Sequence, residues 1–270
     1  APRSRLAPIS RRARRLPRMR TSPPVLPGSA VSSESPSDRA LALAQAGERD
    51  AAIRWAAAIL KADPSVPMAL TLVGRLLGEA GRQEVAREAC TVAIERAIDL
   101  ENLPLAVVAA REAERYGADI GPLLDVIADA FCAGSARFGQ GAAPPVHLPN
   151  ADTFQPLASV LTGALLNNKA VEIVHECKKK LEAADRPGIS ALPLFSALDA
   201  PSLRQLCEAM QPEWLPVDHV VIEQGAEGED AYWVARGELE ARRTRRMETI
   251  QLARLRAGAL FGEMALLSRT

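Results

Sequence analysis

The residue types best suited to ligand recognition lie near the end of the chain, in one run of six. The run consists of Phe261, Gly262, Glu263, Met264, Ala265 and Leu266. Gly262 can turn sharply and lets another molecule approach the main chain closely, because it has no side chain. The Glu263 carboxylate can accept a charge-assisted hydrogen bond from a hydroxyl group. A short helix that starts here leaves the amides of residues 264–266 available to an anion, which the small Ala265 does not crowd.

The elements that must position this run are short β-strands separated by glycines. After Pro212 the hydrophobic period changes from about 3.6 residues to about two. The strands predicted from this pattern cover residues 220–222, 231–234, 238–243 and 249–255. Glycines stand at the turns, as Gly225, Gly228, Gly237 and Gly258. Short strands with glycine turns between them are typical of an antiparallel roll or barrel.

Residues 192–270 resemble the cyclic nucleotide-binding domain family, a β-roll flanked by helices. The resemblance rests on the turn glycines, the apolar pair Val221-Ile222, the strand Ala231–Val234 and the Phe-Gly-Glu-x-Ala-Leu run. Leu192–Leu198 is similar to the family's entry helix. The resemblance implies that cyclic AMP or cyclic GMP is the ligand, with no further cofactor. It places Glu263 on the ribose 2′-hydroxyl and the amides after it on the cyclic phosphate.

The family also clamps the phosphate with an arginine, whose expected place is about two residues beyond Thr270 and whose forked side chain suits a phosphate. Arg269 is two or three residues out of register and is not assigned this role. We therefore expect an incomplete roll, with weak or no cyclic nucleotide binding by residues 1–270 alone. The alternative is a roll that keeps its glycines for folding and binds no ligand.

The first half of the chain shows helical periodicity and an internal repeat. A shift of 34 residues places Gly47 on Gly81, Ala52 on Ala86, Ala56 on Cys90, Ile59 on Ala93 and Ala40 on Gly74. Small residues thus coincide where two helices approach closely, and glycine recurs at the turn. The pattern resembles the tetratricopeptide repeat, and a divergent third helix pair follows over about 102–116 and 121–133. An unrelated Ala-rich bundle of helical hairpins is the alternative interpretation.

Together these patterns predict an α+β multidomain chain. An all-α helical repeat comes first, and an incomplete antiparallel, jelly-roll-like β-roll with flanking helices comes last. The expected order is a disordered basic arm (1–37), a tetratricopeptide-like region (38–133), a linker (134–151), a helical pair (152–186) and a cyclic nucleotide-binding domain (187–270). The pair is expected as helices over about 153–168 and 169–184, and a short helix over 199–210 is capped by Asp199 or Ser202.

The net charge of zero conceals an asymmetry along the chain. Residues 1–33 hold eight arginines and no acid, which leaves 25 basic against 33 acidic side chains in the rest. An acidic body disfavours nucleic acid as a partner. No stretch approaches the ~20 apolar residues needed to span a bilayer, and the basic arm lacks the apolar core of a signal peptide.

The cysteines and histidines form no pattern that predicts catalysis or metal binding. Four widely spaced cysteines in a chain of this size predict free thiols in a reducing cytoplasm. Cys177 stands beside three lysines, which can lower a thiol pKa, although an ordinary half-buried cysteine is the simpler interpretation. His147, His175 and His219 have no triad-like order with a carboxylate or cysteine. We therefore expect no enzyme activity, no metal and no transmembrane segment.

Three functions are consistent with these features. The first is signal transduction by a sensor, in which a cyclic nucleotide binds the roll and the helices around it shift to alter a protein contact. The second is a protein-interaction scaffold, in which the helical repeats bind a protein partner and the roll is structural. The third is a transcription regulator, which requires a helix-turn-helix after the roll.

Overall fold

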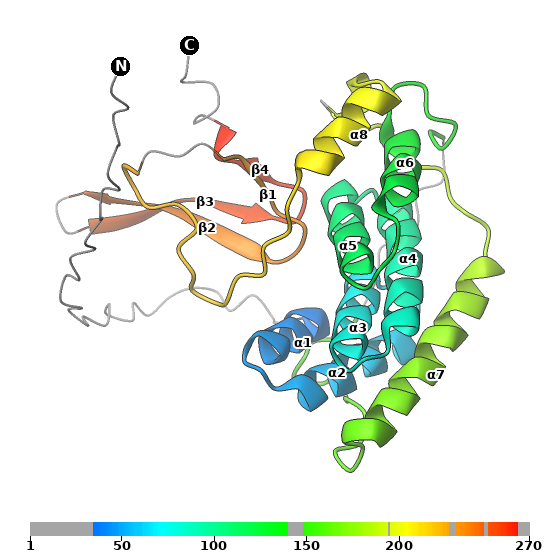
Figure 1. The fold of residues 1–270 in the computed structure, drawn as a ribbon. Helices are drawn as coiled ribbons and strands as arrows, with labels where there is room; N and C mark the ends of the chain where they lie inside the picture. The colour runs from blue at the N-terminus through cyan, green and yellow to red at the C-terminus, as the bar shows by residue number, and fades with distance from the viewer. Residues whose placement is uncertain (1–34, 140–147, 194, 227–229, 246–247, 264–270) are drawn as a thin grey trace, which may run out of the picture. The chain divides into compact units, whose positions relative to one another are not determined.

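The computed structural model describes residues 35–139, 148–193, 195–226, 230–245 and 248–263, all within one structural unit, Ser33–Thr270 (Figure 1). Helices come first along the chain and strands last, so the predicted α+β layout is confirmed. The helices are α1 (Pro36–Gln45), α2 (Arg49–Ala62), α3 (Pro67–Glu79), α4 (Gln83–Asp99), α5 (Leu103–Arg115), α6 (Ile120–Phe131), α7 (Gly163–Glu182), the 3-10 turn η1 (Phe195–Ala197) and α8 (Ala200–Ala209). The strands are β1 (Tyr232–Trp233), β2 (Glu238–Arg245), β3 (Glu248–Arg256) and β4 (Leu260–Phe261).

The first six helices form three pairs, and the turn inside each pair is closed in the same way. Gly47, Gly81 and Gly117 have φ angles of +80°, +81° and +89°, a conformation that glycine adopts without strain. The residue after each glycine donates its amide to a carbonyl of the preceding helix. These bonds run from Glu48 to Leu43, from Arg82 to Leu77 and from Ala118 to Ala113. They satisfy carbonyl groups that a helix end otherwise leaves without a partner.

The buried positions follow the same 34-residue register. The aligned residues Ala52 and Ala86, Ala56 and Cys90, and Ile59 and Ala93 are all fully buried. A Cβ added at Gly74 would lie 2.9 Å from Cys90 Sγ and 3.2 Å from Ala89 Cβ. The expected close approach of paired helices at small residues is therefore present, and α3 and α4 leave no room there for a methyl group.

The predicted helix pair over 153–168 and 169–184 is wrong, because this part of the chain forms one continuous helix, α7, that begins only at Gly163. Residues 153–162 are not helical. The helix begins at Gly163, whose amide donates a hydrogen bond to Asp50 Oδ2 of α2 at 2.9 Å. The carboxylate of a neighbouring helix thus satisfies a backbone amide at the start of α7.

Two asparagines in the middle of α7 do not interrupt it. Asparagine is unfavourable inside helices because its side chain competes for the local backbone. Here Asn167 Oδ1 accepts a hydrogen bond from Arg49 at 3.4 Å, and Asn168 Oδ1 accepts one from Arg82 at 3.0 Å. Both amides are thus bonded to other parts of the helical region, and the helix continues through them.

The predicted short helix over 199–210 is confirmed as α8, and Asp199 caps it. Asp199 Oδ1 accepts a hydrogen bond from the Ser202 amide at 2.8 Å, and hydrogen bonding to Ser202 lowers the pKa of the Asp199 carboxyl. Leu203 and Cys207 are fully buried, and α8 packs against α6. The helix therefore belongs to the helical part of the structure.

The strands pair in two antiparallel ladders, β1 with β4 and β2 with β3, with a bulge in the second between Ala241 and Arg242. The strands predicted over 231–234, 238–243 and 249–255 are present as β1, β2 and β3. The strand predicted over 220–222 is wrong. Val220 is 63% exposed, Ile222 is 46% exposed and neither lies in a strand. A strand needs a neighbour for its backbone hydrogen bonds, and within the described part of the chain nothing pairs with this stretch.

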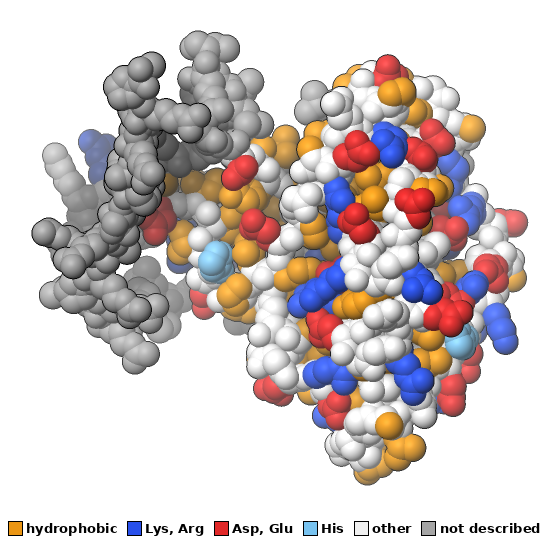
Figure 2. All heavy atoms as spheres, in the orientation of Figure 1, with side chains coloured by type: hydrophobic (Ala, Val, Ile, Leu, Met, Phe, Trp, Pro, Cys, Tyr) orange, Lys and Arg blue, Asp and Glu red, His pale blue; other side chains and the backbone are white. Residues whose placement is uncertain are grey.

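Mixed charge covers the helical face displayed in Figure 2, where basic and acidic side chains are interspersed. Ion pairs on the helices include Arg75 with Glu79 at 3.1 Å and Arg204 with Asp125 at 2.6 Å. Exposed pairs of this kind each stabilise a protein by only ~0–1 kcal/mol.

One ion cluster is buried, and it ties the end of α4 to the chain after α6. Asp99 Oδ2 lies 2.8 Å from an Arg96 guanidinium nitrogen, and Asp99 Oδ1 lies 2.7 Å from one of Arg137. Arg137 also donates to the Pro187 carbonyl at 3.0 Å. The first residues of the predicted linker over 134–151 are thus anchored to the helical core.

Replacing Asp99 with alanine should lower the free energy of unfolding by about 3–5 kcal/mol, because it leaves Arg96 buried without its counter-charge. Urea unfolding measures this change. The matched control is Glu84→Ala at an exposed position of the same helix, which should cost less than ~0.5 kcal/mol. Equal stability of Asp99→Ala and the parent protein would contradict the prediction.

Ala86→Leu tests the close contact between α3 and α4. The larger side chain should overpack that contact and destabilise the protein by about 1–3 kcal/mol. Thermal melts followed by circular dichroism measure the effect, again with Glu84→Ala as the control. A variant that melts like the parent would show that the contact has room and that the 34-residue register is misplaced.

Candidate functional site

The predicted ligand-binding run is described as far as Glu263. Met264, Ala265 and Leu266 lie outside the described residues. Phe261 ends β4 opposite Tyr232 of β1, and the two rings stack with their centroids 5.2 Å apart. Helical conformation begins at Glu263, which is exposed. The structure thus places this carboxylate at the surface, directly after a paired strand.

Gly262 has a structural role of its own. Its φ is +81°, and a Cβ built on it would lie 2.8 Å from the carbonyl oxygen of Asp230. A side chain here would collide with the backbone that leads into β1. The positive φ agrees with the sharp turn predicted at Gly262, and the absence of a side chain there also admits the protein's own main chain.

The other predicted glycines stand at turns. Those that the structure describes have positive φ angles: Gly225 at +83°, Gly237 at +95° and Gly258 at +90°. Gly228 lies outside the described residues. The Gly258 amide donates to the Val234 carbonyl at 2.8 Å, and its own carbonyl accepts from Trp233 Nε1 at 2.9 Å. These bonds hold the turn before β4 against the end of β1 and so position the start of the candidate site.

The described residues of the stretch Leu192–Leu198, predicted as an entry helix, form the 3-10 turn Phe195–Ala197 and no longer helix. The Phe195 ring stacks on Trp233, with centroids 4.1 Å apart and an angle of 18° between the planes. An aromatic pair of this kind contributes ~0.5–1.5 kcal/mol beyond the area it buries. The stretch therefore contacts β1 through one side chain.

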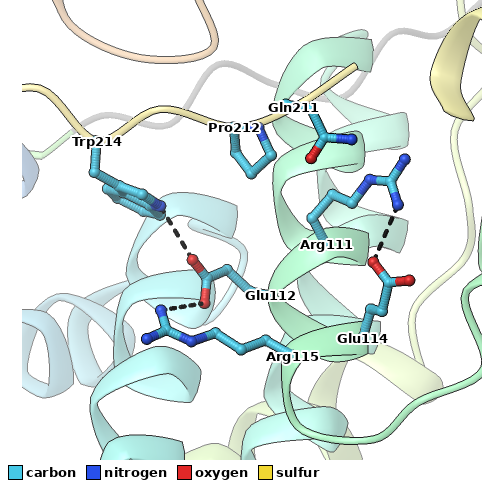
Figure 3. A pocket seen from close by; sticks show the side chains of 7 residues that line it. All are labelled: Arg111, Glu112, Glu114, Arg115, Gln211, Pro212 and Trp214. Atoms are coloured by element: carbon cyan, nitrogen blue, oxygen red, sulfur yellow. Dashed lines mark hydrogen bonds and ion pairs between the residues drawn. The ribbon is translucent and has the colours of Figure 1, made fainter. Parts of the chain in front are cut away.

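A cavity that the sequence did not predict lies beside α5 and has a volume of about 410 Å³ (Figure 3). It is lined by Arg111, Glu112, Glu114, Arg115, Gln211, Pro212 and Trp214. Glu112 is only 4% exposed, and its Oε1 accepts a hydrogen bond from Trp214 Nε1 at 3.0 Å. Glu112 Oε2 lies 4.0 Å from Arg115 and has no hydrogen bond within the described part of the chain.

The electrostatics of this cavity follow from the burial of Glu112. Burial raises the pKa of its carboxyl, and Arg75 and Arg115 act in the opposite direction. The pKa of the neighbouring Tyr116 is also raised by burial, to about 12, and its hydroxyl donates to the Arg75 carbonyl at 2.9 Å. The Arg75 guanidinium lies 4.8 Å from the centroid of the Trp214 ring, a cation–π contact. Trp214 is therefore held by an anion and a cation from two different helices.

Sequence spacing alone does not indicate this cavity, because Glu112 and Trp214 are 102 residues apart. One local signal is visible in α5. Glu112 shares a helical face with Leu105, Ala109 and Tyr116, all of which are buried. A carboxylate on an apolar face requires a hydrogen-bond donor from elsewhere, and that requirement identifies Glu112 but not its partner.

The cysteines and histidines add no second candidate. All four cysteines are free and buried. Burial raises the pKa of Cys177 to about 11, so the low-pKa alternative for this thiol is wrong. His175 lies 3.2 Å from Glu88, which also pairs with Lys178 at 2.6 Å, and this contact is an ion pair without a nucleophile. His147 lies outside the described residues, and among those described no group of three or more potential ligands could hold a metal ion.

Comparison with known proteins bears on the C-terminal part of the chain. Residues 212–270 match the family model of the cyclic nucleotide-binding domain. The match includes Glu263 and the turn glycines, and it begins after α8, whereas the domain was predicted from residue 187. Searches of curated proteins and of solved structures found no match. Within the described residues, no helix is both long and apolar enough to cross a membrane.

The buried Glu112 carboxyl should make stability depend on pH. Its pKa is raised above the ordinary value of 4.5, so the folded protein binds the proton more tightly than the unfolded chain. The free energy of unfolding should therefore fall as pH rises from 4.5 through the folded pKa. The groups that act on this carboxyl are Arg75, Arg115, Trp214 and Glu79.

Urea unfolding of the parent protein and of Glu112→Gln over this pH range isolates the effect, because glutamine does not titrate. The stability of the parent relative to the variant should decrease with pH and then level off. Glu114→Gln on the same helix controls for the loss of one negative charge. Parallel pH profiles for the parent and Glu112→Gln would rule out the raised pKa.

Proposed function

We propose that this protein is a non-enzymatic cyclic nucleotide sensor. Its C-terminal roll binds cyclic AMP or cyclic GMP, and its helical part binds a protein partner. The observation that carries the proposal is the match of residues 212–270 to the cyclic nucleotide-binding domain. Within that match Glu263 is exposed directly after β4, where its carboxylate can accept a hydrogen bond from a ribose hydroxyl.

The helical conformation of Glu263 itself supports the second half of the proposed site. The first amides of a helix have no intrahelical partner and attract anions. By resemblance to the family, the amides of residues 264–266 bind the cyclic phosphate. One short stretch then recognises both the sugar and the charge of the ligand.

The helical part is proposed to be a tetratricopeptide-like protein-interaction region. Support comes from the repeated closure of the turns at Gly47, Gly81 and Gly117 and from the burial of residues that coincide at a shift of 34. In stacked helix pairs, equivalent helices recur along the array and form an extended binding surface. In this chain the first helices of the pairs are α1, α3 and α5.

A scaffold whose roll binds no ligand is the second candidate, and one observation favours it. Gly262 is required by the approach of the chain to Asp230, and Gly225, Gly237 and Gly258 are explained by positive φ angles. These glycines are therefore needed for the fold whether or not a ligand binds. Glu263 separates the two candidates, because an exposed carboxylate has no comparable packing role.

Glu263→Ala should weaken cyclic nucleotide binding by about tenfold to a hundredfold, which corresponds to ~1.5–3 kcal/mol for a hydrogen bond to a charged group. The fold should be unaffected, because the side chain is exposed. Calorimetry with cyclic AMP and cyclic GMP on the parent protein and the variant measures the change.

The control for this experiment is Glu248→Ala, at an exposed position where β3 begins. It removes the same charge from the same part of the chain and should leave the affinity unchanged. An unaltered affinity in Glu263→Ala refutes the ribose contact. Absence of cyclic nucleotide binding by the parent protein favours the scaffold instead.

A further inference from the structure

Residues 211–216 run without regular structure along three helices of the helical part. Each of these helices is the first of its pair, and each contributes one side chain to the segment. From α1, Gln45 Nε2 donates to a backbone carbonyl of the segment. From α3, the Arg75 guanidinium lies over the ring of Trp214, and from α5 the buried Glu112 accepts the indole N–H.

These contacts recognise both the main chain and one side chain of the segment. Gln45 binds the carbonyl of Leu215, a group that every residue carries. Pro212 and Pro216 flank the contact, and proline favours extended backbone in itself and in the residue before it. Trp214 is the one side chain held by charged groups. The same arrangement would bind any extended segment with an aromatic donor at this place.

We propose that the surface shared by α1, α3 and α5 is a docking surface for an extended peptide segment of a partner protein that carries a tryptophan, and that residues 211–216 occupy it in cis. The proposal rests on the proposed function in one respect, namely that the helical part binds a protein partner. It specifies the chemistry of that partner and identifies the chain's own segment as its competitor.

Tryptophan fits this surface because of the Glu112 carboxylate. A buried carboxylate is costly unless it is hydrogen-bonded. The indole combines a large apolar ring with a single N–H that only donates, and Arg75 adds a cation–π attraction. Phenylalanine fills the same space but leaves Glu112 without its donor.

Two features allow a partner segment to replace the resident one. The resident segment competes mainly because it is tethered, which gives it an effective concentration of the order of millimolar. It also leaves part of the surface unfilled, since the cavity of about 410 Å³ beside Trp214 extends along Arg111 and Arg115. A longer partner segment can use that space as well as the tryptophan contact.

Fluorescence anisotropy with a labelled peptide of residues 209–218 tests the proposal, with the whole 270-residue chain as the receptor and no nucleotide present. The parent chain should bind weakly, because its own segment holds the surface. Trp214→Ala should release that segment and bind the peptide at least about tenfold more tightly. Trp214→Phe keeps a ring in place and removes only the donor, so it should also bind the peptide more tightly than the parent chain does. It replaces Trp214→Ala as the receptor if that variant fails to fold.

Matched controls distinguish recognition of tryptophan by Glu112 from nonspecific peptide binding. A peptide with phenylalanine in place of tryptophan should bind Trp214→Ala about tenfold less tightly, because it cannot donate to Glu112. Adding Glu112→Gln to Trp214→Ala should also weaken binding of the original peptide. Adding Glu114→Gln should not, because the Glu114 carboxylate pairs with Arg111 at 3.0 Å.

Failure of both folded Trp214 variants to bind the peptide would overturn the proposal, and so would equal binding of the two peptides. The result is independent of the nucleotide titration. Failure of peptide binding leaves a cyclic nucleotide affinity of the roll untouched, and a failed nucleotide titration leaves the peptide result standing.

Discussion

Close approach between backbones is the constraint on which both parts of this structure depend. In the helical part, α3 and α4 meet where a Cβ at Gly74 would lie 3.1 Å from the Ala86 carbonyl oxygen. In the C-terminal part, a Cβ at Gly262 would lie 2.8 Å from the Asp230 carbonyl oxygen. Interior packing density is therefore reached by bringing main chains together rather than by filling space with large rings. This is consistent with an aromatic content of only 4%.

The features that could be predicted from the sequence are those with local causes. Gly47 and Gly81 were identified from their spacing, because a turn with positive φ favours glycine whatever surrounds it. Asp199 was one of two candidate caps, with Ser202, and a cap can be predicted because its carboxylate bonds an amide only three residues away. The strands β2 and β3 were predicted from alternation within a single stretch, and their pairing needs only the short connection between them.

The features that were missed depend on groups far away in the chain. Helix α7 continues through Asn167 because Arg49, 118 residues earlier, donates a hydrogen bond to the Asn167 side-chain oxygen. The stretch 220–222 has strand-forming residues, but a strand also requires a partner that its own sequence does not supply. The bond between Glu112 and Trp214 joins residues 102 positions apart. In each case the local sequence sets a preference for a secondary structure or a contact. Whether that structure or contact forms depends on a side chain or backbone far away in the chain.

Trp214 has particular importance because it belongs to two parts of the chain at once. It lies near the start of the residues that match the cyclic nucleotide-binding domain, and it contacts α3 and α5. A ligand can shift an equilibrium only by its differential affinity for the two states. The docked segment depends on a hydrogen bond to a charged group, of ~1.5–3 kcal/mol, and a cation–π contact of ~0.5–2 kcal/mol. Coupling energies between allosteric sites are typically ~1–3 kcal/mol. In the proposed sensor, the contacts of Trp214 are therefore of the size needed to couple nucleotide binding in the roll to peptide binding on the helices.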